Sequence, residues 1–116
     1  CMTNTTCDTE EETALMNAFT TLDECDATGY SRQALTSEAV AVDTSNDRAE
    51  FDAADASFTG LSGDATRDIQ GALVFKFVSD DTDSIPIAFV DFASDITSAA
   101  TTINVPWNAE GILQLT

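Results

Sequence analysis

Most of the chain alternates apolar and polar residues with a period of two, the pattern of a β-strand with one buried face. The alternation begins near residue 34. Residues 69 to 78 are the strongest strand candidate, with Leu73 and Phe75 expected on one side and Ala72 and Val74 on the other. Other short apolar segments predict strands at residues 40–42, 48–58, 85–92, 103–107 and 111–115. Polar turns separate these segments, so the sequence predicts a mainly β fold, as an antiparallel sandwich or a small barrel.

One segment near the start has a helical period instead. Thr9 and Glu12 match a capping box, and acidic residues at positions 10 to 12 suit the positive end of a helix. Apolar residues then recur at helical spacing, at positions 14, 15, 18, 19 and 22. We therefore expect one short N-terminal helix at about residues 9–22.

Two prolines limit where their strands can lie. Pro86 and Pro106 lack an amide hydrogen, so each is expected at a strand end or on a sheet edge. The 116 residues suit one domain, and we expect residues 1–116 to form a single β-rich structural domain.

The charge is strongly acidic. Twenty-one Asp and Glu residues outnumber four Lys and Arg residues, which gives a formal net charge of −17. Such a surface repels phosphates and anionic lipids, so neither nucleic acid nor a membrane is an expected partner. A basic protein surface, divalent cations or high salt would relieve the repulsion.

Histidine is absent, which removes the commonest general base and the commonest metal ligand. We therefore expect no catalytic residues, no cofactor and no enzymatic activity. Paired carboxylates are numerous because acidic residues are abundant, so no single pair points to a hydrolase. Asp91, between two apolar residues, is the most conspicuous one, and we expect it to face outward or lie at an edge.

One loop is a candidate calcium site. Asp80, Asp81 and Asp83 crowd a short polar segment, and carboxylate oxygens are the ligands that calcium prefers. The spacing does not match an EF-hand, since the required glycine and closing glutamate are missing. A solvated turn is the favoured interpretation, and a calcium- or carbohydrate-binding module stays as an alternative function.

Three residues are candidates for contact with another subunit. Pro106 and Trp107 lie at the end of a predicted strand, where an aromatic edge could bury against a neighbour. Arg48 either pairs locally with the acids around it or reaches another subunit.

The cysteines show no metal-binding spacing. Cys1, Cys7 and Cys25 are odd in number, so a disulfide framework is not expected, and we interpret them as reduced, partly buried thiols. Cys1-Met2 at the start is interpreted as the end of a strand that begins upstream.

Four sequence segments together resemble a known family. They are Thr28-Gly29-Tyr30-Ser31-Arg32-Gln33-Ala34-Leu35, Asn46-Asp47-Arg48-Ala49-Glu50-Phe51-Asp52-Ala53, Ser84-Ile85-Pro86-Ile87-Ala88-Phe89-Val90-Asp91-Phe92 and Trp107-Asn108-Ala109-Glu110-Gly111-Ile112. In this order and spacing they resemble small virion structural proteins encoded in the structural-gene regions of tailed phages. The resemblance covers residues 28–116 well and the first segment only loosely.

The resemblance implies a structural role and carries no catalytic residues. It leads us to expect a capsid decoration or cement protein that binds the major capsid protein, with a tail or head-fibre component as the alternative. The protein would then be located in the virion after assembly in the host cytoplasm, and a homo-oligomer on the particle is the expected state.

Overall fold

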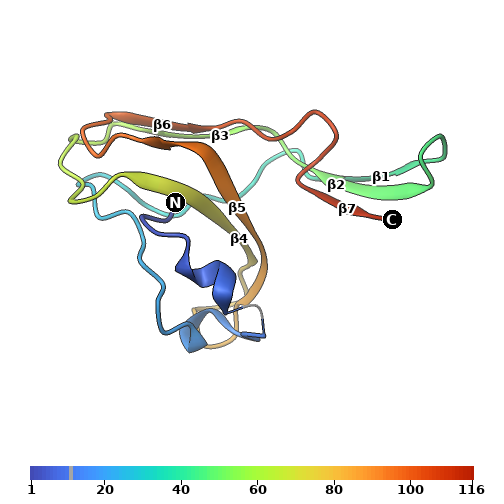
Figure 1. The fold of residues 1–116 in the computed structure, drawn as a ribbon, viewed down its shortest axis with the longest axis horizontal. Coiled ribbons are helices and arrows are strands. Elements are labelled where there is room, and N and C mark those ends of the chain that lie inside the picture. The colour runs from blue at the N-terminus through green and yellow to red at the C-terminus, as the bar shows by residue number, and fades with distance from the viewer. Residues whose placement is uncertain (11) are drawn as a thin grey trace.

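The computed structural model describes residues 1–10 and 12–116, and its regular structure is mainly strand (Figure 1). The strands are β1 (Ala39–Asp43), β2 (Arg48–Asp52), β3 (Ala56–Thr59), β4 (Ile69–Lys76), β5 (Ile85–Ile96), β6 (Thr102–Val105) and β7 (Leu113–Leu115). They pair antiparallel in three small sheets, ordered β1-β2-β7, β3-β6 and β4-β5. The mainly β prediction is confirmed, and the described strands close no barrel.

The main part of the molecule, which we call the body, is built like a sandwich. The β3-β6 and β4-β5 pairs contribute apolar side chains to one core, which also takes in Cys25, Ala27 and Leu61. The core residues on the strands are Phe58, Ile69, Ala72, Ile103 and Val105. Alternation in β6 buries Ile103 and Val105 and leaves Thr102 and Asn104 exposed, as the period-two pattern predicts.

Both prolines lie where a missing amide hydrogen is tolerated. Pro86 is in β5, which pairs only with β4, and it is opposite Phe75 next to a register shift. Pro106 directly follows the last residue of β6. The expectation of edge or end positions is confirmed for both.

Gly71 in β4 allows an unusually close approach. A Cβ atom there would lie 2.4 Å from the ring of Phe89 and 2.7 Å from the carbonyl oxygen of Val90. Met2 lies on the other side of β4, where its amide donates to the Gly71 carbonyl at 2.8 Å. The segment that begins the described chain is thus attached to the β4-β5 hairpin by a single β-bridge.

The continuous helix predicted for residues 9–22 does not form, and Glu11 within that range lies outside the described residues. The segment instead has two short 3-10 helices, η1 (Thr6–Thr9) and η2 (Met16–Ala18). The Glu10 carboxylate accepts hydrogen bonds from the Thr20 amide, at 2.8 Å, and from the Thr20 and Thr21 hydroxyls. These bonds fold the segment into a loop, and they replace the capping role expected for its acidic residues.

Two reciprocal contacts join the loops at one end of the body. The Thr28 amide and hydroxyl donate to Asp64, and the Thr66 amide and hydroxyl donate to Asp26. The hydroxyl bonds are both 2.7 Å long. Because these bonds favour the charged form, they hold the pKa of both carboxyls below its usual range.

The third sheet, β1-β2-β7, extends away from the body, to the right in Figure 1. We call this sheet the arm (residues 39–52 and 113–115). Gly111 turns the chain into β7 with a φ of 97°, and the next amide, that of Ile112, donates to the Phe51 carbonyl at 2.8 Å. No helix in the described part of the chain has the length and apolar character to cross a membrane.

Candidate assembly surface

The register of the strand pairs in the arm determines which side chains lie on each of its two faces. Residues opposite one another in an antiparallel pair point to the same side of the sheet. Val40 is opposite Phe51, which is opposite Leu113, and Val42 is opposite Ala49, which is opposite Leu115. One face of the arm therefore carries only apolar side chains. We call it the arm face; its residues are Val40, Val42, Ala49, Phe51, Leu113 and Leu115.

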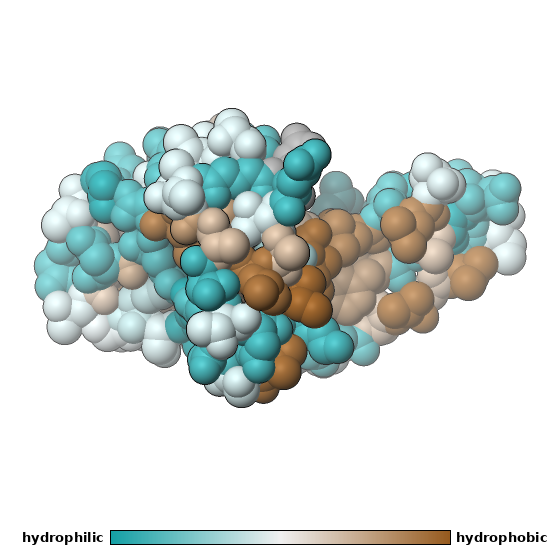
Figure 2. All heavy atoms as spheres, turned by 90° about the horizontal axis from the view of Figure 1, so that it is seen from below, coloured by the Kyte–Doolittle hydropathy of each residue, from teal (hydrophilic) through white to brown (hydrophobic). Residues whose placement is uncertain are grey.

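Half of the arm face is open to solvent, while Ala49, Phe51 and Leu113 are half-buried. Val40, Val42 and Leu115 are 75%, 73% and 76% exposed, and they are the most exposed large apolar side chains of the described residues. An antiparallel sheet in water ordinarily packs its apolar face against other parts of the protein. Figure 2 shows hydrophobic residues, in brown, on the side of the arm that faces the viewer. A face of this composition is typical of a surface that another molecule covers.

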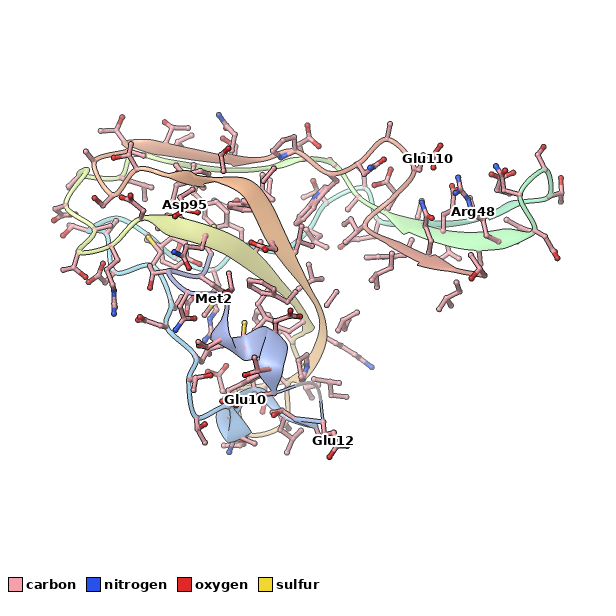
Figure 3. All side chains as sticks on the ribbon, viewed as in Figure 1. Met2, Glu10, Glu12, Arg48, Asp95 and Glu110 are labelled. Atoms are coloured by element: carbon pink, nitrogen blue, oxygen red, sulfur yellow. The ribbon has the colours of Figure 1, made fainter. Side chains whose placement is uncertain are left out.

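The opposite face of the arm is charged and held together by Arg48. The guanidinium of Arg48 lies 2.7 Å from Glu50, 3.4 Å from Asp43 and 3.1 Å from Glu110, and it also donates to Gln114. Figure 3 shows Arg48 and Glu110 on the same upper side of the arm. The local pairing predicted for Arg48 is present, and it links β1, β2 and the segment before β7. A contact of Arg48 with another subunit stays a prediction.

A groove continues the arm face onto the body. It has a volume of about 580 Å³ and runs from the base of the arm along β4. Apolar side chains dominate its lining, among them Leu35, Phe51, Phe75, Phe77, Ile87 and Trp107. Phe51 belongs to both the arm face and the groove, so the two surfaces are continuous and turn to the same side of the molecule. Figure 2 looks onto this side and shows a brown area between body and arm.

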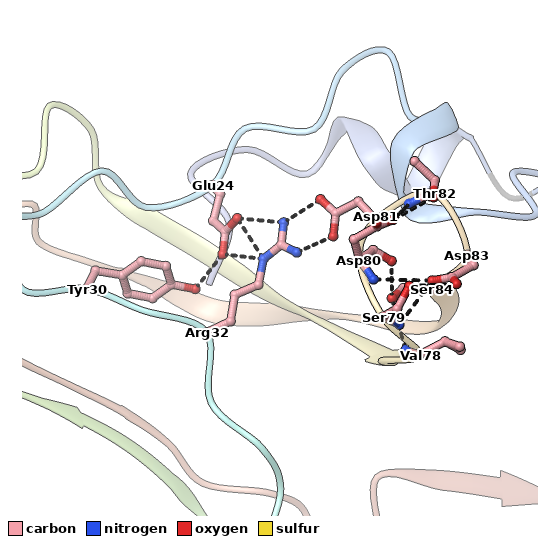
Figure 4. Close-up of polar contacts among 10 residues, drawn as sticks. All are labelled: Glu24, Tyr30, Arg32, Val78, Ser79, Asp80, Asp81, Thr82, Asp83 and Ser84. Atoms are coloured by element: carbon pink, nitrogen blue, oxygen red, sulfur yellow. Dashed lines mark hydrogen bonds and ion pairs between the residues drawn. The ribbon is translucent and has the colours of Figure 1, made fainter.

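A polar cluster lies at the side of the groove (Figure 4). Glu24 accepts from the Tyr30 hydroxyl at 3.0 Å and from Arg32, and Arg32 in turn makes a bidentate contact with Asp81. The Arg32 guanidinium also lies over the ring of Phe75, 5.2 Å from its centre. Burial, with the Glu24 charge as a smaller cause, raises the pKa of Tyr30, so the phenol stays protonated and donates.

Trp107 lies between the core and the groove. Its indole N–H donates to the Ala54 carbonyl at 3.1 Å, and its amide donates to Asp55 at 2.9 Å. The ring packs against the body core and is only half-buried, while Pro106 beside it is exposed. Trp107 therefore both holds the end of β6 and offers a surface. Its predicted contact with a neighbour, like that of Pro106, stays a prediction.

The aspartates of the candidate calcium loop are directed to different partners (Figure 4). Asp81 turns to Arg32, which lowers the pKa of the Asp81 carboxyl. Asp83 accepts from the Ser79 hydroxyl and from two amides, and Asp80 accepts from Thr82. Among the described residues, no group of three or more Asp, Glu or Cys side chains is arranged to hold a metal ion. Calcium binding by this loop stays a prediction.

The remaining candidate groups are placed as ordinary structural residues. Asp91 is exposed on β5, opposite Gly71, as expected from its position between apolar neighbours. Cys7 and Cys25 are buried, Cys1 is partly buried, and all three are free thiols. Burial raises the pKa of the Cys7 thiol, which keeps it in its unreactive neutral form.

No family model, curated protein or solved structure matches this chain. The resemblance to virion structural proteins therefore stays a prediction from the sequence segments quoted above, and the open arm face and groove are the observations on which function can be argued.

The sequence pattern predicted the strands of the arm but not its open face. Val40 and Val42 alternate as strand residues do, and this favoured a buried position in a sandwich. The turn of residues 44–47 sets the register and aligns apolar residues of both strands on one side, but it does not signal that this side is exposed.

Proposed function

We propose that this chain is a non-enzymatic structural subunit of a viral particle, in which it serves as a capsid decoration or cement protein. The observation that carries an assembly role is the arm face, a complete apolar sheet face with no covering element among the described residues. The resemblance of residues 28–116 to virion structural proteins of tailed phages is the reason for proposing that the assembly is a viral particle.

The distribution of charge indicates two kinds of contact surface, one apolar and one acidic. The arm face and groove are apolar, and the formal charge of −17 is spread over the rest of the molecule. An acidic exterior favours docking onto a basic patch of a capsid subunit, because complementary charges guide association and fix orientation. Many copies on one lattice would add avidity to individually weak contacts.

A structural role also fits the way in which the polar groups are used. The carboxylates of Asp26 and Asp64 accept hydrogen bonds from amides and hydroxyls of neighbouring loops, and that of Asp83 accepts them from residues of its own loop. Their contacts stabilise turns, and each carboxylate is occupied by these bonds.

The test is copurification with the particle. Particles of the virus that carries the gene are purified by density gradient, and the chain is quantified against the major capsid protein. We expect a fixed ratio set by the capsid lattice. Particles stripped of the chain are then mixed with recombinant protein, and we expect rebinding that weakens as salt is raised. Absence of the chain from purified particles would overturn the proposed function.

A further inference from the structure

The arm face and the groove differ from the rest of the surface in charge. No arm-face residue is charged, and the charged residues that line the groove are Glu24, Glu38, Arg32 and Lys76. Their formal charges balance, although the whole chain carries −17. Two of the four basic residues of the sequence therefore lie on this one side. A second copy can approach here without placing excess negative charge against excess negative charge.

The shape of the molecule makes the two surfaces complementary. The arm projects from the body, and its apolar face turns to the same side as the groove (Figures 1 and 2). A second copy offers the same two surfaces, so the projecting sheet of each copy can pack into the groove of the other. A two-fold axis would place each arm in the groove of the other copy, as an isologous contact requires.

We propose that a second copy of this chain covers the arm face, and that the two copies clasp each other reciprocally, arm face to groove. The proposal rests on the assembly role proposed above and names the first partner of that surface. It leaves the acidic exterior of both copies free to dock on a basic lattice.

The size of the surfaces favours the reciprocal arrangement over arm-to-arm contact. With strands about 4.8 Å apart and a rise of about 3.4 Å per residue, a three-stranded sheet of five residues has a face of only about 240 Å². A stable interface buries about 800 Å² on each partner. Two arm faces in contact fall far short of this, and the clasp comes closer because it engages both the arm face and the groove on each copy.

The charge of the whole molecule gives the clasp a characteristic salt dependence. Two copies repel through their net charges, and the screening length falls from about 10 Å at 0.1 M salt to about 3 Å at 1 M. Added salt therefore strengthens the association of two copies. It weakens the docking of an acidic surface on a basic one, so the two kinds of contact are told apart by the sign of the effect.

The test is sedimentation velocity of the full chain over a concentration series at low and high NaCl. We expect a monomer–dimer equilibrium that moves toward dimer with salt. Val42→Asp, on the arm face, is expected to stay monomeric under all these conditions. Ala41→Asp, on the opposite face of the same strand, adds the same charge and is expected to dimerise like the wild type. Circular dichroism and thermal melting establish that both variants fold.

Three results would overturn the proposal: a wild-type chain that stays monomeric throughout, equal dimerisation of Val42→Asp and Ala41→Asp, or growth beyond two copies. A wild-type monomer that still rebinds to stripped particles would overturn the clasp and leave the proposed function standing. A dimer that never appears on purified particles would overturn the proposed function and support the clasp.

Discussion

The body and the arm have the same alternating strand pattern, but the apolar side chains are buried in the body and exposed in the arm. In the body, alternating apolar residues meet those of a second strand pair, and Ile103 is only 1% exposed. In the arm, the same alternation in β1 leaves Val42 73% exposed, because no second layer lies against it. Period two thus determines that a strand has an apolar side, and the rest of the fold determines whether that side stabilises the chain itself or its association with another molecule.

The largest expected difference between the two regions comes from removing an apolar side chain. Ile103→Ala leaves a cavity in the body core and is expected to lower the free energy of unfolding by about 2–5 kcal/mol. Val42→Ala in the arm removes no buried contact and is expected to change it by less than about 0.5 kcal/mol in the monomer. Urea unfolding at low protein concentration measures both, and equal losses would contradict the comparison.

A smaller effect is expected from adding an atom where strands are closest. Gly71→Ala places a methyl group against the Phe89 ring and the Val90 carbonyl in the body, and it should cost about 1–3 kcal/mol. Gly111→Ala is the counterpart at the arm. Its Cβ would lie 2.9 Å from the Phe51 carbonyl at a φ of 97°, which should loosen β7 locally. Hydrogen exchange is expected to show the first change throughout the body and the second only in the arm.

Acid should act on the body through its two reciprocal threonine contacts. The pKa values of Asp26 and Asp64 are lower in the folded than in the unfolded chain. Their stabilising effect is therefore present above the unfolded pKa near about 4 and is lost as the pH falls toward the folded values. The Asp26→Asn/Asp64→Asn double variant should melt below the wild type at pH 7, and the gap should narrow as the pH falls below the unfolded pKa and through the lowered folded values.

The gap in melting temperature is the measured quantity because protonation also relieves the repulsion among the twenty-one acidic residues, in wild type and variant alike. Asp43→Asn in the arm is the control: Asp43 has a lowered pKa through Asn46, and its contacts with the β1–β2 turn and with Arg48 lie within the arm. We expect this variant to leave the melting temperature of the body nearly unchanged. A gap that persists undiminished in acid would contradict the role of the two contacts.

The smallest expected effect is that of calcium. Because Asp80, Asp81 and Asp83 have separate partners, CaCl₂ and MgCl₂ at equal concentration are expected to raise the melting temperature equally, by screening the negative charge. The Asp83→Ala variant should respond like the wild type in thermal melts. A calcium-specific rise that disappears in this variant would instead establish a site in the loop.

The local pattern was sufficient for the strands and insufficient for the N-terminal segment. Pro86, Pro106 and the alternation in β6 are decided by backbone hydrogen bonding and nearest neighbours, which the sequence shows directly. The helix expected at residues 9–22 depended on local signals, namely a capping box, acidic residues near its start and apolar spacing. The bond that the Thr20 amide donates to the Glu10 carboxylate and the bond from the Met16 amide to the Ser84 carbonyl outweigh this local preference, and a short isolated helix is too weak to resist them.

The candidate surface required three-dimensional information for a different reason. Val42 is exposed because no other part of the described chain packs against it. The local pattern of one strand does not show whether a second layer will cover that strand. The groove likewise brings Leu35, Phe77 and Trp107 together from distant parts of the chain. Only the ion pairs of Arg48 with Asp43 and Glu50 could be anticipated, because these residues are close in sequence.

Lys76 is the only lysine of the sequence, and it lies in the lining of the groove. Its side-chain amine is therefore a built-in chemical reporter of that one location. A reagent that modifies amines would label Lys76 readily on free chains and slowly wherever the groove is filled, and mass spectrometry of the labelled peptide would read the difference inside an intact particle. Few surfaces can be followed in this way without introducing a probe, and here the scarcity of basic residues provides it.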